Sequence, residues 1–328
     1  MTAMHTESVS IESLKQDSRI YVAGHRGLVG QALVRLLKRE GFANVILATH
    51  AELELTDQAA TDVFFETRKP EFVFSAAAKV GGIMANKTYP VDFLHENILI
   101  QTSLLRAAQR HGVRKVLLLG SSCIYPRLAP QPIREESLLT GPLEATNQWY
   151  AIAKIAGILL GQAYREQYGM NVISAMPTNL YGPGDNFDLE SSHVLPAMIR
   201  KFHEAKANGS RQVILWGSGT PLREFLHVDD LAEASLFLMR HYNEGEVINI
   251  GSGRDISIKE LAALIGDVVG FSGEVVWDKS KPDGTPRKLL DISKISELGW
   301  RPSIDFYDGL TKICQYFSSR YDSNKENI

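Results

Sequence analysis

The chain has 328 residues, of which 44% are hydrophobic and 22% are charged, and its formal net charge is −3. This length and composition are typical of a globular protein with one large domain or two. The charge excludes the basic surface that nucleic acids and acidic membranes attract, and no apolar run approaches the roughly 20 residues of a bilayer span. The two cysteines, Cys123 and Cys314, are too few for a disulfide framework or a metal cluster. We therefore expect a cytoplasmic protein without a metal.

Short β-rich runs alternate with segments of helical spacing in the first half of the chain. The polar residues 1–18 and 321–328 are expected to be tails. This alternation predicts βαβ units, and hence an α/β fold with a doubly wound parallel sheet of Rossmann type over residues 19–177. Strands are predicted at 19–23, 44–48, 71–75, 115–119 and 171–176, with helices that include 30–40 and 97–110.

The pattern becomes more irregular after Pro177. Strands are predicted at 212–216 and 246–250 on either side of a helix at 228–240, and a stretch rich in Pro and Gly follows at 279–287. We expect residues 178–320 to form mainly a smaller α/β domain that binds substrate, with some later segments returning to the first domain.

Residues 21–30, YVAGHRGLVG, lie between the first strand and the first helix, where a dinucleotide-binding turn is found. Gly24, Gly27 and Gly30 would permit the turn, the approach of a pyrophosphate and the packing of helix on strand. The helix start, with Leu28 and Val29, would offer free N–H groups to the phosphates. The alternative is a glycine-rich turn without a ligand.

The end of the second strand bears on the choice between NAD and NADP. NAD enzymes usually place an acid there, but this strand ends at Thr49 and His50, with no acid before Glu52. Arg26 in the glycine turn and His50 favour a 2′-phosphate, and therefore NADP(H). The alternative is that Arg26 is a solvated loop charge.

Three side chains suit hydride transfer to a carbonyl. Ser121 follows the predicted strand 115–119, and Tyr150 and Lys154 share one helix face. The Lys154 charge would favour the tyrosinate and bond a nicotinamide ribose. Tyr150 would donate a proton to the carbonyl oxygen, which Ser121 would help to hold.

Cys123 and His193 suit a second reaction, the removal and return of a proton next to a ketone. Cys123 lies in the same loop as Ser121, and near a cation its thiolate would be a base. The alternative is a small core residue. His193 would supply an acid near neutral pH, or it simply starts a helix expected at 194–207. Cys314, between apolar neighbours, is expected in the core.

Several segments together resemble the GDP-L-fucose synthase family of extended short-chain dehydrogenases/reductases, from about Arg19 to Trp300. They are GHRGLVG, SAAAKVGGI, LGSSCIYP, YAIAKIAG, MPTNLYGP, WGSGTPLREFLHVDD and KPDGTPRKLLD. The resemblance implies an NADPH-dependent 3,5-epimerase and 4-reductase that converts GDP-4-keto-6-deoxy-D-mannose to GDP-L-fucose. Cys123 would be the base and His193 the acid, and Ser121, Tyr150 and Lys154 would stabilise the enolate oxygen.

The same resemblance implies binding residues and a homodimer. Subunits would pair through the helix carrying Tyr150 and the helix around 97–110. His50 and Lys201 stand where bacterial relatives carry Arg, which would soften the preference for NADP and weaken one contact to the substrate. The implied cofactor contacts include Pro177, Asn179, Leu180, Lys154 and His193, and the implied substrate contacts are Lys201, Trp216, Arg223 and Asp283.

Two competing functions share part of this pattern. A 4-epimerase that retains NAD would need the glycine turn and the Tyr150–Lys154 pair, but not Cys123 with His193. A non-catalytic regulator that binds NADPH would have no need of Ser121, Tyr150 and Lys154 together.

Overall fold

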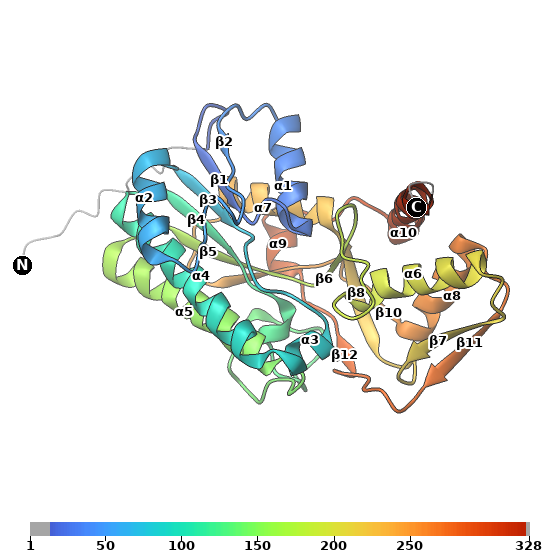
Figure 1. Cartoon of the computed structure of the whole chain (residues 1–328). Helices are drawn as coiled ribbons and strands as arrows, with labels where there is room; N and C mark the ends of the chain where they lie inside the picture. The colour runs from blue at the N-terminus through green and yellow to red at the C-terminus, as the bar shows by residue number, and fades with distance from the viewer. Residues whose placement is uncertain (1–13, 326–328) are drawn as a thin grey trace, which may run out of the picture.

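A six-stranded parallel sheet forms the centre of the computed structural model, which describes residues 14–325 (Figure 1). The strand order is β2-β1-β3-β4-β5-β9, so the chain leaves β1 toward one edge and later returns to its other side. This reversal between β1 and β3 is the switch point at which doubly wound sheets bind ligands. The strands are β1 (Ile20–Ala23), β2 (Val45–Ile46), β3 (Phe72–Ser75), β4 (Lys115–Leu119), β5 (Val172–Pro177) and β9 (Val247–Ile250).

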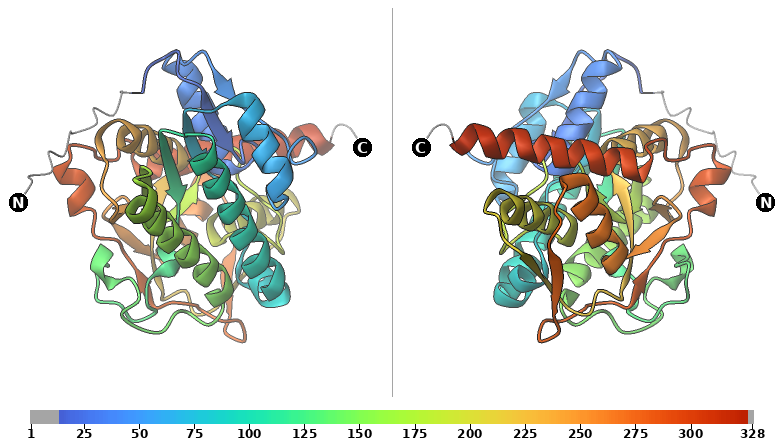
Figure 2. Two further views of the ribbon diagram at one scale, coloured as in Figure 1. Left: turned by 90° about the vertical axis from the view of Figure 1, so that its left-hand side faces the viewer. Right: turned by 90° about the vertical axis from the view of Figure 1, so that its right-hand side faces the viewer.

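Helices cover both faces of this sheet, which explains why its strands are apolar on both sides. Alternate residues of β1 illustrate this: Ile20 and Val22 pack toward one face, and Tyr21 and Ala23 toward the other. One face is covered by α1 (Leu28–Arg39) and α7 (Val228–His241). The other is covered by α2 (Gln58–Arg68), α4 (Pro90–Arg110) and α5 (Gln148–Tyr168), of which α4 and α5 run side by side (Figure 2, left).

A smaller α/β unit lies beyond the carboxyl ends of the central strands (Figure 1). Its strand β8 (Leu222–His227) pairs with β6 (Asn179–Tyr181), β10 (Asp255–Ser257) and β12 (Arg287–Lys288), while β7 (Gln212–Trp216) pairs with β11 (Glu274–Asp278). Three helices enclose a second core: α6 (Val194–Ala207), α8 (Ile258–Val269) and α10 (Phe306–Lys325). Shorter helical segments are α3 (Ile83–Thr88), η1 (Ser122–Ile124), η2 (Glu135–Ser137) and α9 (Ser293–Glu297).

The predicted α/β fold with a parallel Rossmann-type sheet is confirmed. The strand predicted at 44–48 is shorter, and the helix predicted at 97–110 begins earlier, at Pro90, where a proline without an N–H fits the first turn. Helix α7 and strand β9 fall within the range expected for the substrate domain, yet they pack on the central sheet, because β9 pairs with β5.

Both segments predicted to be tails are folded in the parts that the structure describes. Residues 1–13 and 326–328 lie outside the described residues. Leu14 packs against the first core, and the turn from Lys15 to Ser18 buries the Ser18 side chain. Helix α10 continues through the expected tail to Lys325. Cys314 is buried in the second core, as predicted.

Glu224 on β8 is a carboxylate with no exposed surface that ties separate segments together. Its two side-chain oxygens accept hydrogen bonds from the backbone N–H groups of Gly253, 2.7 Å away, and Leu290, 3.0 Å away. Its carbonyl oxygen accepts from the side chains of Thr178 and Asn179. Burial raises the pKa of Glu224, although the backbone donors oppose that rise. The carboxylate thus fixes β8 against β9, β6 and β12.

Replacing Glu224 by Ala should lower the free energy of unfolding by about 3 kcal/mol, because two buried N–H groups lose their acceptors and a cavity opens. Urea denaturation measures this change. The control is Glu244→Ala, an exposed residue at which we expect less than about 0.5 kcal/mol. Equal midpoints for the two variants would show that the buried carboxylate does not stabilise the fold.

Candidate active site

A cavity of about 1550 Å³ opens at the carboxyl ends of the central strands. Its walls come from the turn after β1, the loops after β3 and β4, the start of α5, the loop after β6, and the segments around β7 and β12. Pockets for one small ligand usually enclose roughly 300–1000 Å³. The cavity therefore has room for two ligands that meet inside it.

The glycine turn forms an anion-binding end of this cavity. Gly27 is the N-cap residue of α1 and has no side chain that could bond the first N–H groups of the helix, and the first turn carries no acidic residue. The N–H groups of Leu28, Val29 and Gly30 therefore have no acceptor within the helix. Added Cβ atoms at Gly24 and Gly30 would strike backbone, whereas one at Gly27 would meet its nearest atom only at 3.5 Å. The turn thus fits a diphosphate.

The two predicted phosphate cations each lie close to a carboxylate. His50 lines the cavity, and its Nε2 lies 2.8 Å from Glu54 Oε2. Arg26 is exposed and is not among the described residues that line the cavity. Hydrogen bonds from Thr49 and then the charge of Arg26 lower the pKa of the Glu52 carboxyl. A 2′-phosphate would therefore compete with Glu54 for His50.

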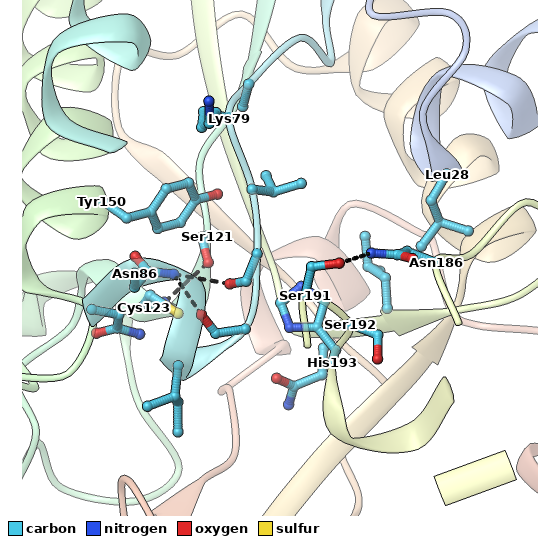
Figure 3. A pocket seen from close by; sticks show the side chains of 18 of the residues that line it. Leu28, Lys79, Asn86, Ser121, Cys123, Tyr150, Asn186, Ser191, Ser192 and His193 are labelled. Carbon is cyan, nitrogen blue, oxygen red and sulfur yellow. Dashed lines mark hydrogen bonds between the residues drawn. The ribbon is translucent and has the colours of Figure 1, made fainter. Parts of the chain in front are cut away.

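The loop after β4 and helix α5 bring the predicted reactive groups together. Ser121 caps the short helix η1, and its Oγ accepts a hydrogen bond from the N–H of Cys123 at 3.2 Å. The Lys154 ammonium donates to Leu119 O at 2.8 Å and lies 5.7 Å from the centre of the Tyr150 ring. Ser121, Cys123 and Tyr150 lie on one side of the cavity and His193 on the other (Figure 3).

Tyr150 is held as a protonated phenol. Burial and then the negative charge of Cys123 raise the pKa of Tyr150, and a hydrogen bond with Ser121 only partly opposes this. This differs from the expectation that Lys154 favours the tyrosinate, because the Lys154 ammonium bonds a carbonyl instead. Burial lowers the pKa of Lys154 to about 8. At neutral pH Tyr150 is therefore suited to donate a proton.

Cys123 and His193 have environments that suit a base and an acid. Burial would raise the pKa of Cys123, but the ammonium of Lys288, 3.4 Å from Sγ, and a hydrogen bond with Ser121 outweigh it, so the pKa is lowered. His193 starts α6 without capping it through its side chain. Its ring is accessible from the cavity but enclosed by protein, and this enclosure and then Lys288 lower the pKa of His193.

The residues expected at the substrate all line the far end of the same cavity. The Lys201 ammonium donates to Ile214 O and lies 5.6 Å from the Trp216 ring centre. Arg223 donates to the backbone carbonyl of Asp283. The Asp283 carboxylate itself accepts from the N–H and the hydroxyl of Ser218, so in this structure it holds a turn. The cofactor residues Pro177, Asn179 and Leu180 also line the cavity.

Four of the described residues that line the cavity carry a buried polar atom with neither a hydrogen bond nor an ion pair to another described residue. The four atoms are Asn86 Oδ1, Asn147 Oδ1, Asp185 Oδ2 and Ser192 Oγ. Burial raises the pKa of Asp185 to about 7. Buried polar groups are normally paired, so these atoms stay unsatisfied unless a bound ligand or a water molecule bonds them. Sequence reasoning missed them, as it missed Lys288, since no local motif marks them.

A sequence model of the NAD dependent epimerase/dehydratase family matches residues 20–251. The chain belongs to this family. Within residues 14–325, no cluster of His, Cys, Asp or Glu is arranged to hold a metal ion. No helix in the same range is long and apolar enough to cross a membrane.

Several family members are similar to this chain over nearly their whole length. "Putative GDP-L-fucose synthase 2" of Arabidopsis thaliana is 59% identical, with 95% of each chain covered. "GDP-L-fucose synthase" of Escherichia coli K12 is 51% identical, with 93% of this chain and 98% of the relative covered. A structure of a GDP-L-fucose synthetase from Naegleria fowleri bound to NADP is 32% identical with a TM-score of 0.87, covering 94% and 97% of the two chains.

Membership in the family implies a nicotinamide dinucleotide as the cofactor, and the geometry of the glycine turn fits its diphosphate. Leu28, Val29 and Gly30 would donate backbone N–H groups to it. Pro177, Asn179 and Leu180 lie where the cavity continues toward Tyr150.

Replacing Gly27 by Ala should weaken NADPH binding at least about tenfold, because the methyl group would occupy the space of the diphosphate. The melting temperature should change little, since no atom blocks that methyl group within the protein. Gly30→Ala is the matched variant, and its methyl group would strike Gly24 O, so its melting temperature should fall strongly. NADPH titration and thermal melts separate the two effects. Unchanged affinity in Gly27→Ala would place the diphosphate elsewhere.

Proposed function

We propose that this chain is a bifunctional enzyme that converts GDP-4-keto-6-deoxy-D-mannose to GDP-L-fucose, as an NADPH-dependent 3,5-epimerase and 4-reductase. The observation that carries this function is the convergence of two sets of groups on one cavity. Ser121, Tyr150 and Lys154 suit carbonyl reduction, and Cys123 and His193 suit proton transfer. The relatives named GDP-L-fucose synthase support the choice of substrate.

Epimerisation would use the acidity of the C–H bonds beside the ketone. The Cys123 thiolate takes a proton from carbon 3 or carbon 5, and the electron pair moves onto the ketone oxygen. Ser121 and Tyr150 donate hydrogen bonds to that enolate oxygen. His193, on the opposite side of the cavity, returns a proton to the carbon and so inverts it.

Reduction would use the same oxygen-binding groups. The bound cofactor supplies the hydride that carbon 4 receives. Tyr150 donates its proton to the oxygen, which its raised pKa permits at neutral pH. Lys154 lies beside that ring and can bond a ribose hydroxyl. His50, which lines the cavity, supports NADPH rather than NADH, as does the NADP bound to the Naegleria fowleri protein.

The nucleotide end of the cavity would bind GDP. Arg223 suits the diphosphate, because a guanidinium bonds phosphate oxygens in pairs. Trp216, with Lys201 beside it, offers an aromatic face to a base. We also propose a homodimer in the cytoplasm, paired through α4 and α5, on which Val91, Ile152 and Leu159 remain exposed.

The product formed from GDP-4-keto-6-deoxy-D-mannose and NADPH in heavy water tests this function. We expect a GDP-deoxyhexose reduced at carbon 4 that carries carbon-bound deuterium at carbons 3 and 5, identified by mass spectrometry and NMR. A reduced product without deuterium would leave a simple ketoreductase. Conversion of other nucleotide sugars with tightly retained NAD would instead support the 4-epimerase.

Two variants should separate the reactions. Tyr150→Phe should lower reduction by at least about 10²-fold while NADPH binding stays nearly intact, because it removes the proton donor alone. Cys123→Ser should abolish deuterium uptake, since a hydroxyl is a far weaker acid than a thiol and supplies no base. NADPH oxidation and deuterium content are measured for both. Full turnover by Tyr150→Phe would assign the proton donor elsewhere.

A further inference from the structure

The proposed base requires a charge that an ordinary cysteine lacks at neutral pH. A free thiol has a pKa of about 8.5, so most of it is protonated at pH 7. Cys123 is also half-buried between the end of β4 and helix α5, where burial favours the neutral thiol. A cation close to the sulfur must therefore offset the burial if Cys123 is to act as a base.

Lys288 on β12 is the cation nearest to the sulfur. Its Nζ lies 3.4 Å from Cys123 Sγ, within hydrogen-bond distance for sulfur. Within the described range 14–325, this is the one hydrogen bond of the Lys288 ammonium, and no carboxylate forms an ion pair with it. Among the residues that the structure describes, no carboxylate thus competes with the sulfur for this ammonium.

The strand that carries Lys288 is held firmly on both sides. Arg287 forms an ion pair with Asp255 at 2.6 Å. Leu289 N–H donates to Gln131 Oε1 at 2.9 Å, and Leu290 N–H donates to the buried carboxylate of Glu224. The backbone on either side of Lys288 is therefore fixed, and its side chain extends toward the loop of Cys123.

Other titratable groups also surround the sulfur. Tyr150 faces it from α5 and is a neutral phenol, and Arg223 faces it from β8. The guanidinium of Arg223 donates to two backbone carbonyls and makes no bond to the sulfur. Glu144, in the loop before α5, lines a small cavity together with Cys123 and Lys288. His193 faces Lys288 across the main cavity.

We propose that Lys288 is a positioning residue that keeps Cys123 as a thiolate and aims its sulfur at the C–H bonds of the substrate. This role rests on the proposed epimerase function. Lys288 acts on both partners of the proton transfer, because its charge stabilises the thiolate and destabilises a protonated His193. The same charge makes the His193 imidazolium a stronger acid, while it lowers the fraction of His193 that is protonated at neutral pH.

Alkylation of Cys123 by iodoacetamide tests the pair without relying on turnover. The NADPH-loaded protein is reacted between about pH 5.5 and about pH 9.5, and labelling is followed by peptide mass spectrometry. Lys288→Met should raise the midpoint by at least about one pH unit, which lowers labelling at pH 7 roughly tenfold. Lys288→Arg should restore most of the low-pH labelling. Cys314, buried and with its pKa raised to about 12, is an internal reference.

The control variant is Lys38→Met, which removes an exposed lysine from α1, far from the cavity. An unchanged midpoint in Lys288→Met, or equal shifts in Lys288→Met and Lys38→Met, would overturn the proposal. If Lys288→Met melts below the assay temperature, Lys288→Gln and Lys288→Arg supply the same comparison of a neutral and a charged side chain.

Deuterium uptake by the substrate gives a second readout. It should fall at least about tenfold in Lys288→Met and recover at higher pH as the thiol ionises. Wild-type protein that takes up no deuterium would contradict the proposed function, whereas the alkylation midpoints would still decide the role of Lys288.

Discussion

The buried carboxylate of Glu224 is the interaction on which the site depends. Backbone N–H groups from Gly253 and Leu290 bond its side chain, and Thr178 and Asn179 bond its carbonyl. These partners belong to the segments that follow β9, precede α9 and connect β5 to β6. A carboxylate without exposed surface is costly unless several donors satisfy it. Because these donors converge only in one arrangement of the segments, Glu224 fixes β8 and β12 relative to the central sheet.

The loop that carries Ser121 and Cys123 is held by a second buried group, Asn249 on β9. The hydroxyl of Tyr125 donates to its side chain at 2.6 Å, and the Asn249 amide donates to carbonyls of the loop at Ile133 and of the segment at Asp291. The loop with the sulfur and the strand with the ammonium are therefore anchored to one scaffold. This explains how a pair of groups from distant parts of the sequence keeps a short separation.

The parts of the site that the sequence predicted are those with a local signature. Ser121 follows a strand, Tyr150 and Lys154 lie one helical turn apart, and the glycine turn joins a strand to a helix, so short-range rules place them. Lys288 is 165 residues from Cys123, and their contact depends on strand pairing that no local pattern encodes. Arg26 is a different case, since the sequence placed it in the turn but left open whether it is a phosphate ligand or a solvated charge; its side chain is exposed.

The fold followed the same division. Periodicity predicted the strands and helices, and some later segments were expected to return to the first domain, but the sequence did not show that these segments are α7 and β9. That return depends on long-range packing: β9 pairs with β5, and α7 packs against α1. The return has a chemical consequence. It brings Asn249, and through it the loop of Cys123, to the edge of the sheet where Tyr150 and Lys154 lie.

Reduction of carbon 4 removes the ketone that makes the neighbouring C–H bonds acidic, so epimerisation must precede it at one shared oxygen site. Burial and then the charge of Cys123 raise the pKa of Tyr150, so Tyr150 is a weaker acid while Cys123 is a thiolate than after Cys123 has taken up a proton. The electrostatics of the site thus favour the order that the chemistry requires.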